Sequence, residues 1–191
     1  MRRRPRNAGS SSGFSLIELM SVLAVAAVLM AIALPELRQL LRTLQFRAAV
    51  NDLSGAIGLA RGQAIARGAR VELVPAGAGG TDWSRGWIVF IDHDGDRRPG
   101  RADEVIAQHG PLADGIVIRT NFSGQQGGAY FAYNGTGRGC TDTSSAAARW
   151  GTLSLFRDGQ VRRIKINMLG RARVCDPARD GASCAGEGEP P

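Results

Sequence analysis

The feature that most limits how this chain can fold is a predominantly apolar run of 21 residues, Phe14 to Leu34, that contains a single carboxylate, Glu18. As a helix it would rise about 1.5 Å per residue and span about 30 Å, the thickness of a bilayer's hydrocarbon core. It is longer than the core of a secretory signal, roughly 7 to 15 residues, and no small-residue cleavage site followed by polar sequence comes after it. We therefore expect a membrane anchor that stays on the protein.

The basic residues before the anchor indicate its orientation in the membrane. Arg2, Arg3, Arg4 and Arg6 precede it, so we expect a single pass of the inner membrane, with the N-terminus in the cytoplasm and everything after Pro35 exported. Beyond this leader, 20 basic residues face 17 acidic ones, and the formal net charge of +7 falls to +3. A chain of 191 residues can bury one sizeable core, which predicts one domain plus the anchor.

A carboxylate such as Glu18 is unfavourable in an apolar membrane segment, so its presence requires an explanation. A carboxylate costs roughly 2.5 to 3.5 kcal/mol near the centre of a membrane helix and less near its edge. The stretch "GFSLIE" resembles the processing site of type IV prepilins, where a prepilin peptidase cuts after the glycine and methylates the new N-terminus. The resemblance implies cleavage between Gly13 and Phe14, and pairing of Glu18 with the terminal amine of a neighbouring subunit in the assembled fibre. The alternative is that Glu18 lies among headgroups at the cytoplasmic interface.

After Pro35 the pattern predicts an amphipathic helix and then strands. Apolar residues recur at three- and four-residue spacing, with Gly68 as a helix end. They are Leu37, Leu41, Leu44, Ala48, Leu53, Ile57, Ala60 and Ala64. From Val71 onward, eight short segments rich in β-branched and aromatic residues predict seven or eight mostly antiparallel strands, and "RDGQ" at 157–160 predicts a tight hairpin.

The predicted fold class is α+β, with a long N-terminal helix, membrane-spanning in its first half, packed on an antiparallel β-sheet domain. The expected divisions are a leader at 1–13, a membrane or fibre-core helix at 14–35, its amphipathic continuation at 36–68, a β-rich domain at 69–175 and a flexible tail at 176–191.

The order of these segments resembles the GspH/FimT branch of minor pilins and pseudopilins. "LARGQAIARGARVEL", "DWSRGWIVFIDHDGDRRPGRADEVI" and "IKINMLGRARV" carry the likeness, which extends to about Val174. It implies a type IV pilin-like fold, other pilin subunits as partners, and a place first in the inner membrane and then in an extracytoplasmic fibre. A minor pilin of a type IV pilus is the main interpretation. A pseudopilin of a type II secretion system, without a nucleic acid role, is the alternative, and an adhesive tip subunit is a third.

A basic cluster near the C-terminus raises the question of DNA. Residues 157–173 hold six basic side chains and one acid. Arg163 and Lys165 should share one strand face, and a turn at "NMLG" would bring them beside Arg171 and Arg173. The Gly-Arg-x-Arg motif at 170–173 resembles that of FimT-like pilins that bind DNA in natural transformation. The four cations are therefore candidate phosphate contacts for double-stranded DNA, and a solvated strand face is the alternative.

Other motifs predict no enzyme and no cofactor. Asp92, Asp94, Asp96 and Asp103 have the spacing of a calcium loop, but Arg97 stands where that loop needs glycine, so we interpret it as a solvated hairpin without metal. "GTGRG" at 135–139 lacks the lysine and the helix of a phosphate-binding loop and is interpreted as a turn. His93 and His109 accompany no recognisable nucleophile motif.

Three cysteines, Cys140, Cys175 and Cys184, predict one disulfide and one free thiol in an exported domain. Pairing of Cys175 with either of the other two is open at this point.

Overall fold

The computed structural model describes residues 15–77, 80–124 and 129–186, and it divides into two compact units between Thr43 and Leu44. Helix α1 (Leu16–Arg67) contributes to both units and continues through Pro35. It ends where the sequence predicts. Gly68 adopts a φ of +61°, and the amide of Ala69 donates to the carbonyl of Ala64, which closes the last turn.

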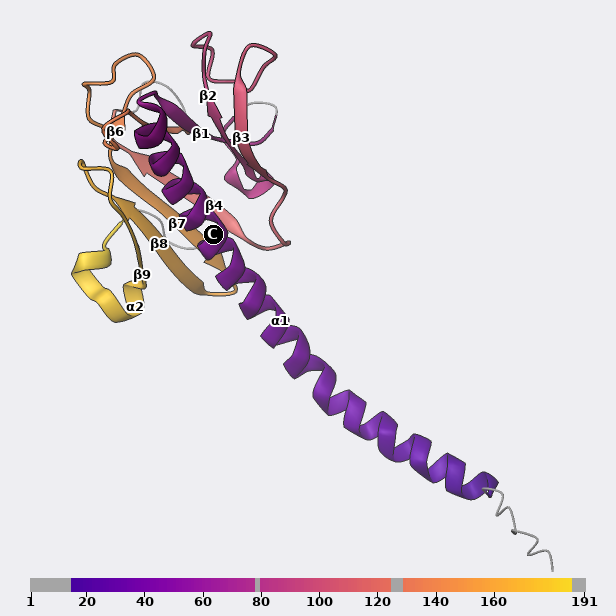
Figure 1. The fold of residues 1–191 in the computed structure, drawn as a ribbon. Helices are drawn as coiled ribbons and strands as arrows, with labels where there is room; N and C mark the ends of the chain where they lie inside the picture. Colours follow the sequence, from indigo (N-terminus) through magenta and orange to yellow (C-terminus); the bar gives the residue numbers. More distant parts are fainter. Residues whose placement is uncertain (1–14, 78–79, 125–128, 187–191) are drawn as a thin grey trace, which may run out of the picture. The chain divides into compact units, whose positions relative to one another are not determined.

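The second unit contains two antiparallel sheets (Figure 1). The first has the order β3-β2-β1-β5-β6 and the second the order β4-β7-β8-β9. The first sheet consists of β1 (Val71–Pro75), β2 (Trp87–Ile91), β3 (Glu104–His109), β5 (Phe131–Tyr133) and β6 (Gly139–Cys140), with a 3-10 turn, η1 (Trp83–Arg85), before β2. The second sheet consists of β4 (Val117–Phe122), β7 (Gly151–Arg157), β8 (Gln160–Ile166) and β9 (Ala172–Cys175).

The predicted strands and turns are present. All eight predicted strand segments are strands, and β6 is an additional short one. The hairpin at "RDGQ" is confirmed, because β7 and β8 pair with Arg157 opposite Gln160. Asp158 and Gly159 between them have φ values of +47° and +76°, the left-handed conformation that a two-residue hairpin turn requires.

The main core lies between one face of α1 and the inner faces of both sheets. From Leu53 onward the predicted helix face is confirmed, since Leu53, Ile57, Ala60 and Ala64 are buried. The earlier residues of the predicted face, Leu37, Leu41, Leu44 and Ala48, are exposed in the single chain. Buried residues in the preceding turns are instead Phe46, Ala49 and Val50, so the face that packs on the sheets keeps one continuous register from Phe46 to Ala64.

The C-terminal segment differs from the loose tail predicted for 176–191. Helix α2 (Pro177–Asp180) is capped by the preceding Asp176, whose side chain accepts from the amide of Ala178, and the 3-10 turn η2 (Gly181–Cys184) follows. A disulfide joins Cys175 to Cys184, while Cys140 is free and buried. We call residues 176–186 the C-terminal cap. The final residues, 187–191, lie outside the described part of the chain.

Candidate functional site

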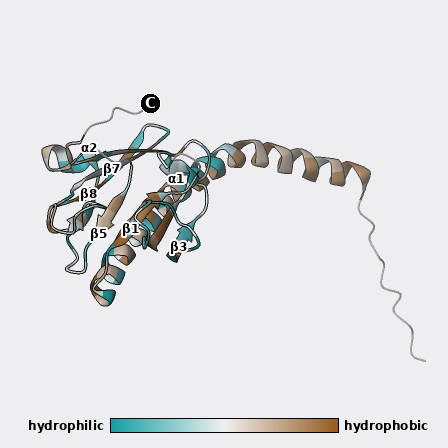
Figure 2. Cartoon of the chain, turned by 90° about the horizontal axis from the view of Figure 1, so that it is seen from above, coloured by the Kyte–Doolittle hydropathy of each residue, from teal (hydrophilic) through white to brown (hydrophobic). Residues whose placement is uncertain are grey.

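The first half of α1 exposes almost every apolar side chain it carries, and Figure 2 shows this stretch in the colours of hydrophobic residues. None of the most apolar window of this helix is buried, and it is the one described helix long and apolar enough to cross a membrane. Glu18 lies in its first turn, where its amide donates to Ser15. Within residues 15–77, 80–124 and 129–186, no hydrogen bond or ion pair of the Glu18 carboxylate is observed. Gly13 and Phe14, the predicted cleavage residues, lie outside the described residues.

The four predicted phosphate contacts occur on one face of the second sheet and on the loop between its strands β8 and β9. Lys165 and Arg173 are directly opposite each other in the pairing of β8 with β9, and Arg163 is opposite Cys175. Side chains two residues apart on a strand share a face, so Arg163, Lys165 and Arg173 project together as predicted. We call these three residues the basic face. Arg171 precedes β9, in the loop 167–171 that the sequence predicts as a turn, and its side chain is exposed.

The C-terminal cap covers this basic face with backbone carbonyl groups. Arg163 donates to the carbonyl of Cys184 at 2.8 Å, and Lys165 donates to that of Ala185 at 2.9 Å. Arg173 donates to the carbonyl of Ser183 at 3.1 Å. These acceptors are neutral, so they hold the cationic groups in place without cancelling their charge. In the structure α2 lies beside β9 (Figure 1).

Sequence reasoning missed two features of this region. The carbonyl acceptors of the cap have no signature in the sequence, because every residue carries a backbone carbonyl. The second feature is Arg138, which is exposed in the loop 134–138. This loop touches the loop of Arg171, since a Cβ added to Gly170 would lie 3.2 Å from the Cα of Arg138. A signal for it was present, because residues 134–138 and 167–171 both read Asn-x-x-Gly-Arg.

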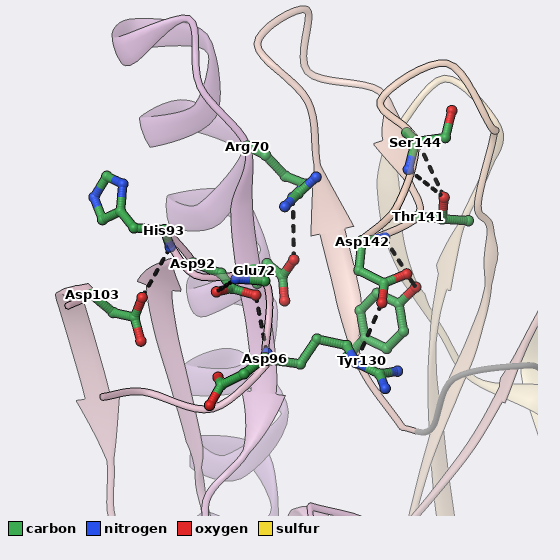
Figure 3. Close-up of polar contacts among 12 residues, drawn as sticks. Arg70, Glu72, Asp92, His93, Asp96, Asp103, Tyr130, Thr141, Asp142 and Ser144 are labelled. Carbon is green, nitrogen blue, oxygen red and sulfur yellow. Dashed lines mark hydrogen bonds and ion pairs between the residues drawn. The ribbon is translucent and has the colours of Figure 1, made fainter. Parts of the chain in front are cut away.

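The four aspartates of the acidic hairpin come together, with their carboxylate oxygens within 4.8 Å of one another. Each accepts a hydrogen bond from a backbone amide of the same loop, so the hairpin is held by its own amide groups. Figure 3 shows three of them, Asp92, Asp96 and Asp103. The carboxylate of Asp92 accepts two of these hydrogen bonds, from the amides of Gly95 and Arg97. Arg97 takes a φ of +61° at the position where a calcium loop has glycine, so the chain makes this turn with an arginine in the left-handed conformation.

A buried carboxylate lies beside this hairpin. Glu72 on β1 is fully buried and pairs with Arg70 at 3.2 Å (Figure 3). Burial, and next the negative charge of Asp92, raise the pKa of Glu72 to about 7. Burial also raises the pKa of the nearby Cys140 thiol to about 11, which keeps that thiol protonated at neutral pH.

A long helix with an exposed apolar first half, followed by a small antiparallel β domain, defines the chain as a pilin-like structural subunit. The comparisons agree. Residues 49–170 match the family of the type II transport protein GspH, and residues 9–34 match the prokaryotic N-terminal methylation motif. The chain therefore belongs to the GspH family of minor pilins and pseudopilins, the structural subunits of type IV pili and type II secretion systems.

Individual relatives support the same class. The chain is 28% identical to the pilin-like protein PilA1 of Thermus thermophilus over 165 residues, which covers 85% of this chain and 97% of that protein. Among solved structures, it is similar to the type IV minor pilin FimU of Pseudomonas aeruginosa, with a TM-score of 0.55 at 14% identity over 75% of this chain and 97% of FimU. A second crystal form of FimU gives a TM-score of 0.52 at 13% identity, over 73% of this chain and 99% of FimU. The likeness to FimU concerns the fold.

Proposed function

We propose that this chain is a minor pilin of a type IV pilus, cleaved by prepilin peptidase between Gly13 and Phe14 and assembled through the first half of α1. The observation that carries the proposal is the exposed apolar surface of this helix, interrupted by one carboxylate in its first turn. Apolar surface of this extent needs lipid or other helices to cover it. Before assembly the inner membrane would cover it, and in the fibre the same helices of other subunits would do so.

Glu18 supplies the assembly signal in this proposal. A carboxylate among apolar helices is strongly disfavoured unless an opposite charge neutralises it, and cleavage after Gly13 creates a new terminal amine on each subunit. Pairing of Glu18 with the amine of the next subunit would then favour the correct stagger between helices.

Glu18→Gln tests the proposal, with Glu36→Gln as the control, because Glu36 is an exposed carboxylate of the same helix. Mass spectrometry of the membrane-extracted chain should find residues 1–13 removed and a methyl group on Phe14 in all three proteins. We expect Glu18→Gln to be processed but absent from sheared filaments, and Glu36→Gln to be present in them. Wild-type chain that keeps its leader, or normal filament incorporation of Glu18→Gln, would contradict the proposal.

DNA binding during natural transformation is a second proposed function. The exposed side chain of Arg171, two residues before Arg173, supports it, as does the pairing of Arg173 with Lys165. Because the acceptors that Lys165 and Arg173 contact are neutral, their charges stay available to attract a polyanion. Binding should be insensitive to DNA sequence and should weaken as salt rises. The contacts of the cap with the basic face instead favour the alternative, a secretion pseudopilin whose cations anchor the cap.

A salt titration of labelled double-stranded DNA separates the two functions. If the wild-type chain binds at low salt and the variant carrying Arg171→Ala and Arg173→Ala does not, the chain is a DNA-binding minor pilin. No binding by the folded wild-type chain, together with copurification of secretion components, would favour the pseudopilin.

A further inference from the structure

Two loops of the β domain have the same sequence pattern and the same hydrogen bonds. In residues 134–138, the amide of Asn134 donates to the carbonyl of Arg138 at 3.0 Å, and the amide of Gly137 donates to the carbonyl of Asn134 at 2.8 Å. The side-chain oxygen of Asn134 accepts from the amides of Thr136 and Arg138, each at 3.1 Å. Asn134 thus bonds to three amides and one carbonyl of this loop.

Residues 167–171 repeat this arrangement. The amide of Asn167 donates to the carbonyl of Arg171 at 3.1 Å, and the amide of Gly170 donates to the carbonyl of Asn167 at 2.9 Å. The side-chain oxygen of Asn167 accepts from the amides of Leu169 and Arg171, each at 3.0 Å. Gly137 and Gly170 have φ values of +75° and +74°. We call the two segments the twin loops, and each ends in an exposed arginine.

The twin loops touch and are held rigidly. A Cβ on Gly170 would lie 2.2 Å from the carbonyl oxygen of Gly137, so the two backbones approach as closely as only glycine allows. Tyr133 donates its hydroxyl to the carbonyl of Gly170 at 3.1 Å, and Arg61 donates to the carbonyl of Gly137 at 2.9 Å. Both loops are therefore tied to the core and to α1, which fixes the starting points of Arg138 and Arg171.

The charge of the twin loops has one sign. Neither loop contains an acidic residue. Within residues 15–77, 80–124 and 129–186, no ion pair of Arg138 or Arg171 is observed, although other surface arginines such as Arg67 and Arg162 are paired with acids. The guanidinium of Arg61, which donates to the carbonyl of Gly137, adds a third positive group next to the loops.

We propose that the twin loops form a two-armed site for the backbone of double-stranded DNA, in which Arg138 and Arg171 contact phosphate groups together. This inference rests on the proposed DNA-binding function and adds Arg138 to it. Guanidinium groups match the geometry of phosphate oxygens, and two arms from adjoining rigid turns suit a ligand that repeats its phosphates. The site is an exposed pair of turns, which fits a long polyanion rather than a small enclosed phosphate.

The test uses the full processed chain in non-ionic detergent, titrated with labelled random-sequence DNA at several salt concentrations. The variants are Arg138→Ala, Arg171→Ala and both together, with Arg98→Ala as a control that removes the same charge from an exposed position of the acidic hairpin. Because the loop hydrogen bonds use backbone groups of Arg138 and Arg171, alanine leaves them intact. Equal melting temperatures of all four variants would confirm that the fold is kept.

The salt slope is the slope of the logarithm of the binding constant against the logarithm of the salt concentration. Loss of one phosphate contact lowers its magnitude by about 0.9, which corresponds to about eightfold weaker binding at 0.1 M salt. We expect this from Arg138→Ala and from Arg171→Ala, roughly sixtyfold from the double variant, and less than about twofold from Arg98→Ala. Arg138→Lys should keep the wild-type salt slope, since it keeps the charge.

Two outcomes would overturn the inference, and they are distinguishable. If Arg171→Ala weakens binding while Arg138→Ala behaves as Arg98→Ala does, the two-armed site is wrong and the proposed DNA-binding function stands. If the wild-type chain does not bind DNA at low salt, both the proposed DNA-binding function and the two-armed site fail.

Discussion

The buried carboxylate of Glu72 should make the β domain less stable as pH rises. Its pKa is about 7 in the folded state and 4.5 as an ordinary glutamate. The folded protein therefore holds this proton more tightly than the unfolded chain does. Below pH 4.5 the carboxyl is protonated in both states, and its contribution to stability is fully present. Between pH 4.5 and 7 only the unfolded chain ionises, so stability falls, and above pH 7 the loss is complete.

The pKa difference sets the size of the effect. One unit corresponds to 1.36 kcal/mol, so this carboxyl should lower the free energy of unfolding by about 3 kcal/mol between pH 4 and pH 8. Glu72→Gln removes the ionisation while keeping a side chain of similar size. We expect the variant to match the wild type near pH 4.5 and to exceed its stability at pH 8 by up to about 3 kcal/mol, or roughly 6 to 12 °C in melting temperature.

Denaturant unfolding of residues 44–191 at several pH values measures this difference directly. Glu104→Gln is the matched control, because it removes the same charge from an exposed position on β3 and should change the profile by less than about 1 kcal/mol. Glu72→Gln and wild-type curves that run parallel from pH 4.5 to 8 would refute the reasoning, since Glu72 would then have the same pKa in the folded and unfolded states.

Three further predictions concern packing and the cap. Gly170→Ala should destabilise the domain by more than Gly159→Ala, which should cost about 1 to 2 kcal/mol. Both glycines have positive φ, but only a Cβ added at Gly170 would clash with backbone atoms. The melting temperatures of the two variants test this difference. Replacing Cys175 and Cys184 together by serine should cost about 2.5 kcal/mol by loop-closure entropy, measured by denaturant unfolding; an unchanged midpoint would contradict it. Leu53→Ala should cost about 2 to 5 kcal/mol in the same assay, because Leu53 is fully buried in the core.

Local sequence rules predicted much of this fold. The period of the apolar residues located eight strands, and the Asp158-Gly159 pair located a hairpin, because both depend on residues close together in the chain. Gly68 marked the end of α1 for the same reason. The division of the strands into two sheets could not be predicted in this way, because it depends on pairing between segments far apart in sequence, such as β1 with β5 and β4 with β7.

The candidate site shows the same limit. Strand alternation correctly placed Arg163, Lys165 and Arg173 on one face, but the cap over them follows from the disulfide and from carbonyl groups that any sequence would supply. The residues of the cap are small or polar, and this composition is typical of a loose tail without apolar side chains to bury. Arg138 is a different case. Its repeated loop pattern is visible in the sequence, but only the contact between Gly137 and Gly170 brings the two loops together.

The outer strands of the two sheets bear on how these subunits avoid aggregation. Three of the four outer strands are short or irregular: β6 has two residues, β9 has four, and an irregularity between Val89 and Phe90 disturbs the register of β2 with the outermost strand β3. The fourth, β4, has six residues in regular register with β7. Short or irregular edges offer few consecutive amide and carbonyl groups to a strand of another molecule. Copies of this domain crowded along a membrane or a fibre should therefore resist edge-to-edge aggregation at these three edges, which favours association through their helices.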